Sequence, residues 1–451
     1  MNQSADTSAD TLALLNDLLS AARKAGADRA DCVQINSISL GASCRMGKLE
    51  DIERSESRDL GLRVMIGQRQ AIVSASDPDR DALGELVTRA VAMAKATPED
   101  PFCGLADKEL LARQWDDLDL YDPIEPATDA LLETAKKAED AARAVPGITN
   151  SEGGSAGWGA SAVALATSDG FSGGYRATSH SISASVLAGE DQNMERDYDY
   201  SSTRHAADLE DAATIGRRAG ERTIRRLNPR KAATTQVPVV YDPRAGNSLL
   251  GHFSGAINGA AIARGTSFLR DKMDQPVFAA GIAICDDPAR KRGLRSRPFD
   301  GEGVACVPLA LVEDGRLKSW LLDSTTARQL KLATTGHAGR GISSPPSPGA
   351  TNLYMAAGAV SPDELIADIK QGFYVTELIG MGVNGITGDY SRGAAGFWIE
   401  DGEIAYPVNE ITIAGNLNDM FAAITPANDL EFHYGTNVPT LRVDGMTIAG
   451  A

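Results

Sequence analysis

Apolar residues recur at helical spacing in several segments of the chain. Leu12, Leu15, Leu18 and Leu19 predict a helix over 10–25, which Gly26 would end. The same kind of pattern predicts further helices over 79–96, 128–144, 207–227, 246–263 and 361–370. The helix at 207–227 carries five arginines, which we interpret as a solvated basic face: Arg217, Arg218, Arg222, Arg225 and Arg226.

Alternating apolar and polar residues predict strands between these helices. Such segments lie at 32–44 and 60–66, and glycine-punctuated strands follow over 148–200, with a hairpin turn at Asp169-Gly170. The last 220 residues are rich in predicted strands. The pattern therefore predicts an α+β protein, in which an N-terminal α/β region with helices packed on mixed sheets is followed by a β-rich C-terminal domain.

Changes in composition suggest how the chain is divided. Residues 101–127 combine prolines with aspartates, which is typical of a connector over the surface. We therefore expect an N-terminal α/β subdomain at 1–100, the connector, a middle α/β subdomain at 128–230 and a β-rich domain at 231–451.

Charge narrows the possible partners. The 451 residues include 44 Lys plus Arg and 61 Asp plus Glu, which gives a formal charge of −17. Phosphate backbones and anionic lipid need a basic surface, so we expect neither nucleic acid nor membrane as a partner. The first residues have no basic region followed by an apolar stretch, so we expect no signal peptide, and the five cysteines form no C-x-x-C pair. This pattern indicates a cytoplasmic protein.

No residue pattern by itself identifies a catalytic site in this sequence. A G-x-G-x-x-G sequence occupies 380–385 after a predicted strand, but three more glycines follow where a nucleotide site needs a helix. No P-loop or nucleophile elbow is present. The five histidines are widely spaced along the chain: His180, His205, His252, His337 and His433. Without further information the chain is an acidic α+β protein with no visible catalytic apparatus.

Three segments do resemble a known family. They are Arg58-Asp59-Leu60-Gly61-Leu62-Arg63-Val64, Asp242-Pro243-Arg244-Ala245-Gly246-Asn247-Ser248-Leu249-Leu250-Gly251-His252-Phe253, and Thr387-Gly388-Asp389-Tyr390-Ser391-Arg392-Gly393-Ala394-Ala395-Gly396-Phe397-Trp398-Ile399-Glu400. Together they resemble the TldD/PmbA family of metalloproteases, on its PmbA (TldE) branch. The resemblance covers residues 10 to 450, so the segment 231–451 is expected to be a TldD/PmbA-type domain.

The resemblance implies that this chain has lost the family's metal motif. The TldD branch carries His-Glu-x-x-x-His on a helix and a cysteine near the C-terminus. The matching positions here hold Gly251, His252 and Ala256, and the last cysteine is Cys306. One imidazole cannot replace the three protein ligands of a catalytic zinc. We therefore expect no catalytic residue and no metal in this chain, with zinc in a TldD-type partner. His252 is then a packing or hydrogen-bonding residue, or a contact to partner or substrate.

The expected function is that of a PmbA/TldE-like, non-catalytic subunit of a cytoplasmic heterodimeric protease. Such proteases act on unfolded peptides, in peptide precursor maturation and antitoxin degradation, and the chain could also pair with itself. Asp389, Tyr390 and Arg392 are candidate substrate-binding residues in a predicted loop over 385–396, unless they cap their own turn. Two alternatives stay open: a peptide-binding or scaffolding protein with no peptidase partner, and an independent hydrolase with an unrecognised site.

Overall fold

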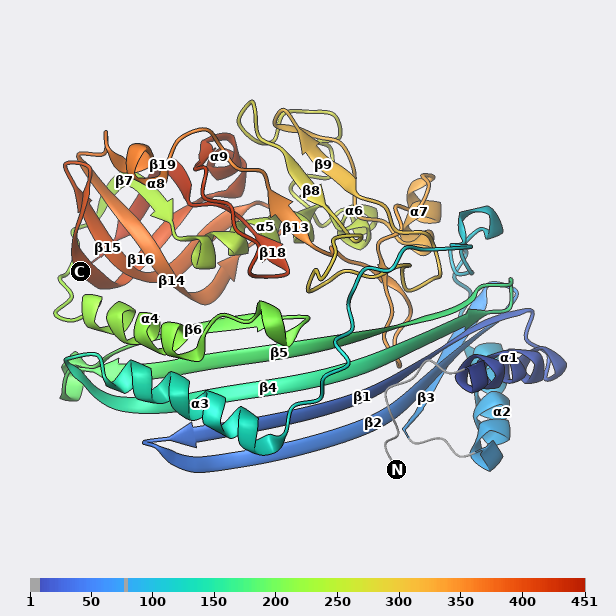
Figure 1. Ribbon diagram of the computed structural model, residues 1–451. Helices are drawn as coiled ribbons and strands as arrows, with labels where there is room; N and C mark the ends of the chain where they lie inside the picture. Colours follow the sequence, from blue (N-terminus) through green and yellow to red (C-terminus); the bar gives the residue numbers. More distant parts are fainter. Residues whose placement is uncertain (1–8, 77–79, 451) are drawn as a thin grey trace.

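The computed structural model describes residues 9–76 and 80–450 and shows two layered halves. A long curved sheet forms the N-terminal half, and a second body of shorter strands and helices lies along it (Figure 1). The α+β class expected from the sequence is confirmed. No helix of the described residues is both long enough and apolar enough to span a bilayer.

The N-terminal half is built on one six-stranded sheet. Its order is β3-β2-β1-β4-β5-β6, and every pairing is antiparallel, whereas the sequence suggested mixed sheets. The segments before and after the connector contribute to the same sheet, because β1 pairs with β4 along most of its length. The strands are β1 (Arg29–Arg45), β2 (Lys48–Ile66), β3 (Arg69–Ser76), β4 (Ile148–Thr167), β5 (Ser172–Ala188) and β6 (Glu195–Thr203).

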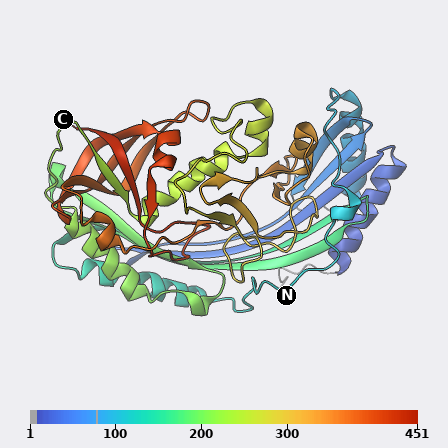
Figure 2. The ribbon, with the colours of Figure 1, turned by 90° about the horizontal axis from the view of Figure 1, so that it is seen from above.

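Four helices cover one face of this sheet and leave the other face to the C-terminal half. Alternate strand residues such as Leu40 and Ala42 pack under a helix, whereas Val33 and Leu165 point to the opposite side and contact Phe299. Figure 2 shows α3 and α4 outside the curve of the sheet and the C-terminal half inside it. The helices are α1 (Ala9–Lys24), α2 (Arg80–Ala96), α3 (Thr128–Arg143) and α4 (Ala212–Arg225).

The C-terminal half contains a mixed sheet in the order β16-β15-β14-β7-β19-β17. An additional pairing of β16 with β19 closes five of these strands into a barrel. The strands are β7 (Thr235–Tyr241), β14 (Gln371–Val383), β15 (Asp389–Glu400), β16 (Glu403–Asn416), β17 (Ile424–Pro426) and β19 (Leu441–Ala449).

Smaller elements complete this half. A five-stranded sheet has the order β10-β9-β8-β13-β18, and β11 pairs with β12. These strands are β8 (Ile284–Asp286), β9 (Leu309–Glu313), β10 (Arg316–Leu317), β11 (Ala338–Gly339), β12 (Ser347–Pro348), β13 (Leu353–Met355) and β18 (Thr436–Asn437). The helices are α5 (Pro243–Ala256), α6 (Gly259–Arg264), α7 (Ser324–Leu330), α8 (Pro362–Ile366) and α9 (Leu417–Ala422).

Two expectations about local structure were wrong. The helix predicted over 246–263 is two helices, because Asn258 caps α6 through a hydrogen bond from the Ala260 backbone amide. The loop predicted over 385–396 is mostly strand β15, and the connection before it is short. Gly393 and Gly396 therefore lie in a paired strand, whereas Gly385 and Gly388 lie in the connection before it.

A buried group of charges joins the two halves near one end of the sheet. Asp31 of β1 accepts hydrogen bonds from Arg63 of β2 and from Arg340, which follows β11. All three side chains are at most 4% exposed. Next to them the segment around Ile342 lies so close to β2 that a Cβ on Gly61 would stand 2.1 Å from the Ile342 carbonyl oxygen. A glycine is therefore required at position 61 for the two halves to meet.

The same region contains a buried carboxyl group with an unusual pKa. Burial raises the pKa of Glu302 to about 7, and the neighbouring Asp300 adds to this. One carboxyl oxygen accepts from the Ser324 amide, and the other has no hydrogen-bond partner among the described residues.

We predict that Glu302→Gln stabilises the protein at alkaline pH. The folded state holds the Glu302 proton more tightly than the unfolded state, so its contribution is complete below about pH 4.3 and is lost as the pH rises through about 7. At pH 8 the variant should melt on the order of a few degrees higher than wild type, and at pH 4 the difference should vanish. Thermal unfolding followed by circular dichroism at several pH values measures this, with exposed Glu313→Gln as the control. Equal melting temperatures of variant and wild type at pH 8 would contradict the prediction.

Candidate functional site

Helix α5 presents a row of polar residues along one side. Asp242 caps its first turn by accepting from the Arg244 amide, and Pro243 occupies the first helical position. Arg244, Ser248 and His252 follow at intervals of four, which places them on one helix face. This helix also carries Gly251, His252 and Ala256, the positions that the sequence analysis aligned with the family's metal motif.

These three positions have different surroundings. Gly251 is exposed, and a Cβ built there would meet nothing within 4 Å. Ala256 is 5% exposed and belongs to the main hydrophobic core. His252 is half-buried, and its Nε2 has no hydrogen-bond partner among the described residues. Within the described ranges, no three His, Cys, Asp or Glu side chains are grouped to hold a metal ion.

Strand β15 supplies the second set of candidate residues. Tyr390 and Arg392 alternate along it and are 2% and 9% exposed, whereas Asp389 is exposed. Asp389 accepts from Thr387 and Asn416, so it stabilises the turn that precedes the strand. The sequence therefore grouped three residues of which only Tyr390 and Arg392 face the interior.

The structure brings the two candidate sets together at His252. Its ring lies edge-on to Tyr390, with ring centroids 6.0 Å apart. Burial lowers the pKa of His252, and the nearby positive charge of Arg392 lowers it further. Burial also raises the pKa of Tyr390. His252 is therefore a neutral imidazole beside a neutral phenol at neutral pH.

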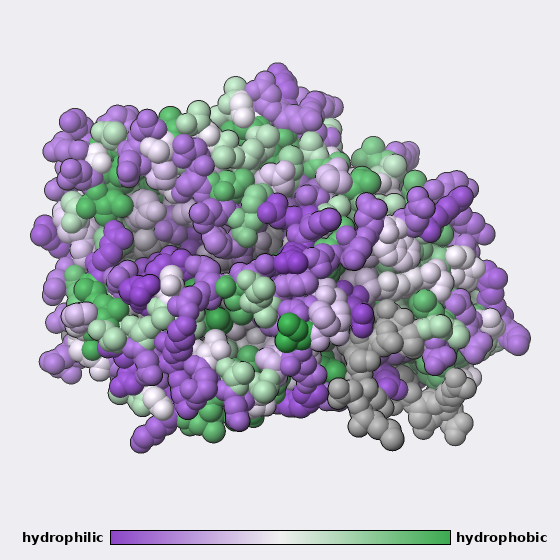
Figure 3. Space-filling view, in the orientation of Figure 1, coloured by the Kyte–Doolittle hydropathy of each residue, from purple (hydrophilic) through white to green (hydrophobic). Residues whose placement is uncertain are grey.

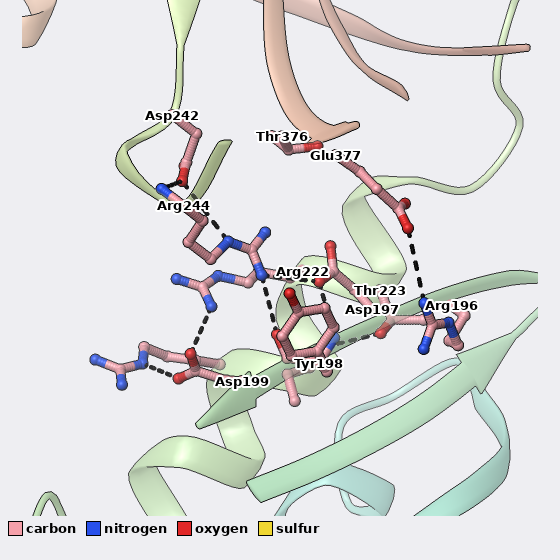
Figure 4. Close-up of polar contacts among 12 residues, drawn as sticks. Arg196, Asp197, Tyr198, Asp199, Arg222, Thr223, Asp242, Arg244, Thr376 and Glu377 are labelled. Carbon is pink, nitrogen blue, oxygen red and sulfur yellow. Dashed lines mark hydrogen bonds and ion pairs between the residues drawn. The ribbon is translucent and has the colours of Figure 1, made fainter. Parts of the chain in front are cut away.

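A cleft of about 310 Å³ opens beside these residues, between the N-terminal sheet and the C-terminal half. Its walls come from β6, the end of α4, α5, β14 and β15. Figure 4 shows Arg196, Asp197 and Tyr198 of β6 below, Thr376 and Glu377 of β14 above, and Arg244 at the side. The cleft is lined by Arg196, Asp197, Tyr198, Arg226, Arg244, Ala245, Ser248, Thr376, Glu377, Leu378 and Arg392.

Ion pairs across this cleft join the two halves a second time. Asp197, with a side chain 4% exposed, pairs with Arg226 and with Arg244. Glu377 pairs with Arg226 and Arg196. Burial works against the charge of Arg244, but Asp197 and Asp242 outweigh it, so the pKa of Arg244 is raised.

The sequence did not point to these ion-paired residues. The interpretation of the arginines on α4 as a solvated basic face is wrong for Arg218, Arg222 and Arg226, which pair with carboxylates of β6. A signal was present in the strand itself, because Glu195, Asp197 and Asp199 alternate along it and put three carboxylates on one face.

Outside this cleft, the face seen in Figure 3 is mainly hydrophilic, and its hydrophobic residues stand in small groups. The lining of the polar cleft contains Arg392 from the candidate residues and Arg244, whose Nε is buried without a hydrogen-bond partner among the described residues.

Comparison with known proteins assigns the family. Models of the PmbA/TldA metallopeptidase match the chain in three parts: domain 1 at residues 30–94, the central domain at 121–227 and the C-terminal domain at 234–450. The chain belongs to this family of metallopeptidases.

Relatives match along nearly the whole chain. Metalloprotease PmbA of Escherichia coli O157:H7 is 39% identical over 97% of this chain and 96% of its own length. A PmbA homolog of Haemophilus influenzae is 36% identical over 95% and 94%. The crystal structure of TldE from Thermococcus kodakarensis has the same fold, with a TM-score of 0.85, 21% identity and coverage of 96% of this chain and 99% of that chain.

The position of Arg392 predicts a change in the titration of His252. Arg392→Gln removes the positive charge that disfavours the imidazolium, so the pKa of His252 should rise towards its ordinary value near 6.5. Proton–carbon NMR of ¹³C-histidine-labelled protein measures this, and His252→Gln identifies the resonance by its disappearance. The exposed Arg217→Gln should leave the titration where it is. An unchanged midpoint in Arg392→Gln would contradict the geometry described above.

Proposed function

We propose that this chain is the PmbA/TldE-like, non-catalytic subunit of a heterodimeric TldD/TldE-type metalloprotease that acts on unfolded peptides. The observation that best supports this proposal is the set of residues on α5, where the positions aligned with the metal motif hold Gly251, His252 and Ala256. Ala256 is packed in the core and Gly251 bears no side chain, so the helix offers a single imidazole where catalytic zinc needs three ligands. Zinc, and the water it would activate, then belong to the TldD-type partner.

The subunit would form part of a chamber around the partner's metal and guide peptide to it. Tyr390 and Arg392 are the residues we assign to peptide binding, while Asp389 holds the preceding turn. We place this activity in the cytoplasm, where the five free cysteines would stay reduced. Peptide precursors and labile antitoxins are the substrates we propose.

The isolated chain should neither hold zinc tightly nor cleave peptides. Elemental analysis of the purified protein should give well below one zinc per chain, and a quenched fluorescent peptide should stay intact. Adding a TldD-type subunit should produce cleavage that a chelator abolishes. About one tightly bound zinc per isolated chain, or chelator-sensitive cleavage by the chain alone, would overturn the proposal. No cleavage by the combined subunits would favour the scaffolding alternative.

The hairpin between β14 and β15 is the surface we assign to the partner. It exposes three large apolar side chains beside the candidate site: Ile379 is 60%, Met381 86% and Ile386 60% exposed. Apolar residues grouped on a protruding hairpin are typical of protein–protein contacts. The partner is a TldD-type subunit, and a second copy of this chain takes its place when that subunit is absent.

We predict that Met381→Ser combined with Ile386→Ser weakens partner binding without affecting folding. Each side chain would lose on the order of 1–3 kcal/mol of burial in the complex, so the dissociation constant should rise at least about tenfold. Surface plasmon resonance with an immobilised TldD-type subunit measures this. Ile124→Ser is the matched control, because Ile124 is 62% exposed and lies on the connector. Unchanged affinity of the double variant would remove the hairpin from the interface.

A further inference from the structure

Arg392 is a buried cation without a carboxylate partner in the described part of the chain. Its residue is 9% exposed, and its Nε donates to the Ile379 carbonyl oxygen at 3.3 Å. No hydrogen bond or ion pair uses its two terminal nitrogens within the described residues. Arg392 nevertheless lines the cleft. The terminal nitrogens are not among the fully buried atoms that lack a partner, so they are open to the cleft and an anion that enters it can reach them.

The strand geometry places the guanidinium there. The pairing of β14 with β15 shifts register between Ile379 and Gly382, so that Gly380 and Met381 stand opposite Arg392. Gly380 has a φ of +78°, which suits the bulged strand. A bulge frees a carbonyl from the ladder and re-aims the side chains near it. The Ile379 carbonyl oxygen accepts a hydrogen bond from Arg392 Nε, and the two terminal nitrogens of the guanidinium are left for a ligand in the cleft.

The other charges of the cleft are already paired. Asp197 lies between Arg226 and Arg244, and Glu377 lies between Arg226 and Arg196. The lining therefore contains four arginines and two carboxylates, in a chain whose formal charge is −17. The other three arginines also pair with carboxylates just outside the lining, namely Glu152, Glu195 and Asp242. Arg392 is therefore the arginine of this lining for which the described residues provide no ion pair.

Two hydroxyl groups of the lining present acceptors. Ser248 Oγ donates its proton to the Ala245 carbonyl at 2.6 Å, and Thr376 Oγ1 donates to the Ala395 carbonyl at 3.4 Å. Both oxygens keep lone pairs for an incoming N–H. A phosphate would require more free hydrogen-bond donors than one guanidinium supplies. A carboxylate next to a peptide N–H requires one guanidinium for the carboxylate and one acceptor for the N–H.

We propose that this cleft binds a carboxylate of the peptide, with Arg392 as its bidentate partner and the hydroxyls of Ser248 and Thr376 as acceptors for the adjoining N–H. The inference rests on the proposed function, because the ligand is a peptide. The carboxylate comes from the peptide's C-terminus or from an Asp or Glu side chain. In either case the site recognises the negative charge of the carboxylate and does not discriminate among the other side chains of the peptide.

The test uses the full isolated chain and three fluorescein-labelled heptapeptides of otherwise identical neutral sequence. One has a free C-terminal carboxylate, one is amidated, and one is amidated with a single glutamate. Fluorescence anisotropy gives each dissociation constant. Binding should be about tenfold or more tighter for at least one peptide with a carboxylate than for the amidated peptide, and the comparison between the first and third identifies the source. Acetate should compete with the preferred peptide.

Variants then assign the effect to Arg392. Arg392→Gln should reduce binding of the carboxylate peptide to the level of the amide, and Arg392→Lys should retain part of the difference. Exposed Arg217→Gln is the matched control and should bind like wild type. Circular dichroism melting checks that each variant is folded. The wild-type comparison of acid with amide needs no variant, so it stands even if Arg392→Gln does not fold.

The outcomes separate this inference from the proposed function. Equal affinity for all three peptides, including no binding of any at millimolar concentration, would overturn the carboxylate site, whatever the complex with a TldD-type subunit does. Loss of partner affinity in Arg392→Gln with unchanged discrimination among the peptides would also overturn it, and would assign Arg392 to a carboxylate of the partner. Failure of the complex to cleave peptides would instead count against the proposed function alone.

Discussion

Asp31 is held between arginines from both halves of the molecule, and the arrangement of the whole chain depends on this contact. Arg63 comes from the neighbouring strand, and Arg340 comes from a segment 309 residues further along the chain. All three groups are buried, so removing one would leave an uncompensated charge in a region of low dielectric. The long sheet and the C-terminal half are therefore fixed against each other at one end by charge as well as by packing.

A second set of ion pairs fixes the other end and creates the site. In the edge strand β6, Asp197 pairs with Arg244 of α5, and Arg196 pairs with Glu377 of β14. Because the two halves meet through paired charges and not through a continuous apolar contact, a polar cleft remains between them. The same arrangement places α5, which carries His252, beside the bulged strand that carries Arg392.

Much of the local structure followed from the sequence, because helical spacing and Asp-Gly turns depend on neighbouring residues. The helices over 10–25, 79–96 and 128–144 and the hairpin at Asp169-Gly170 lie where the pattern put them. The single large sheet was not predictable, since the pairing of β1 with β4 joins residues far apart in the chain. The glycines of β15 led to a wrong prediction of a loop for a related reason. Gly396 belongs to a paired strand, and a Cβ there would stand 1.9 Å from the Tyr374 carbonyl oxygen of the neighbouring strand. His252 and Arg392 were each selected from motifs, but their proximity is a property of the tertiary structure.

The late position of Arg340 in the chain has a consequence for synthesis on the ribosome. The last strand of the long sheet ends at Thr203, but Phe299, which packs on its inner face, comes about 100 residues later, and Arg340 comes about 140 residues later. At about 5–20 residues per second, the sheet waits roughly 7–30 s with Asp31 paired to Arg63 alone. Until Phe299 has been made, Val33 and Leu165 on the inner face have no cover from the C-terminal half. The nascent chain is then an open sheet with an apolar surface, which is the state that general chaperones bind.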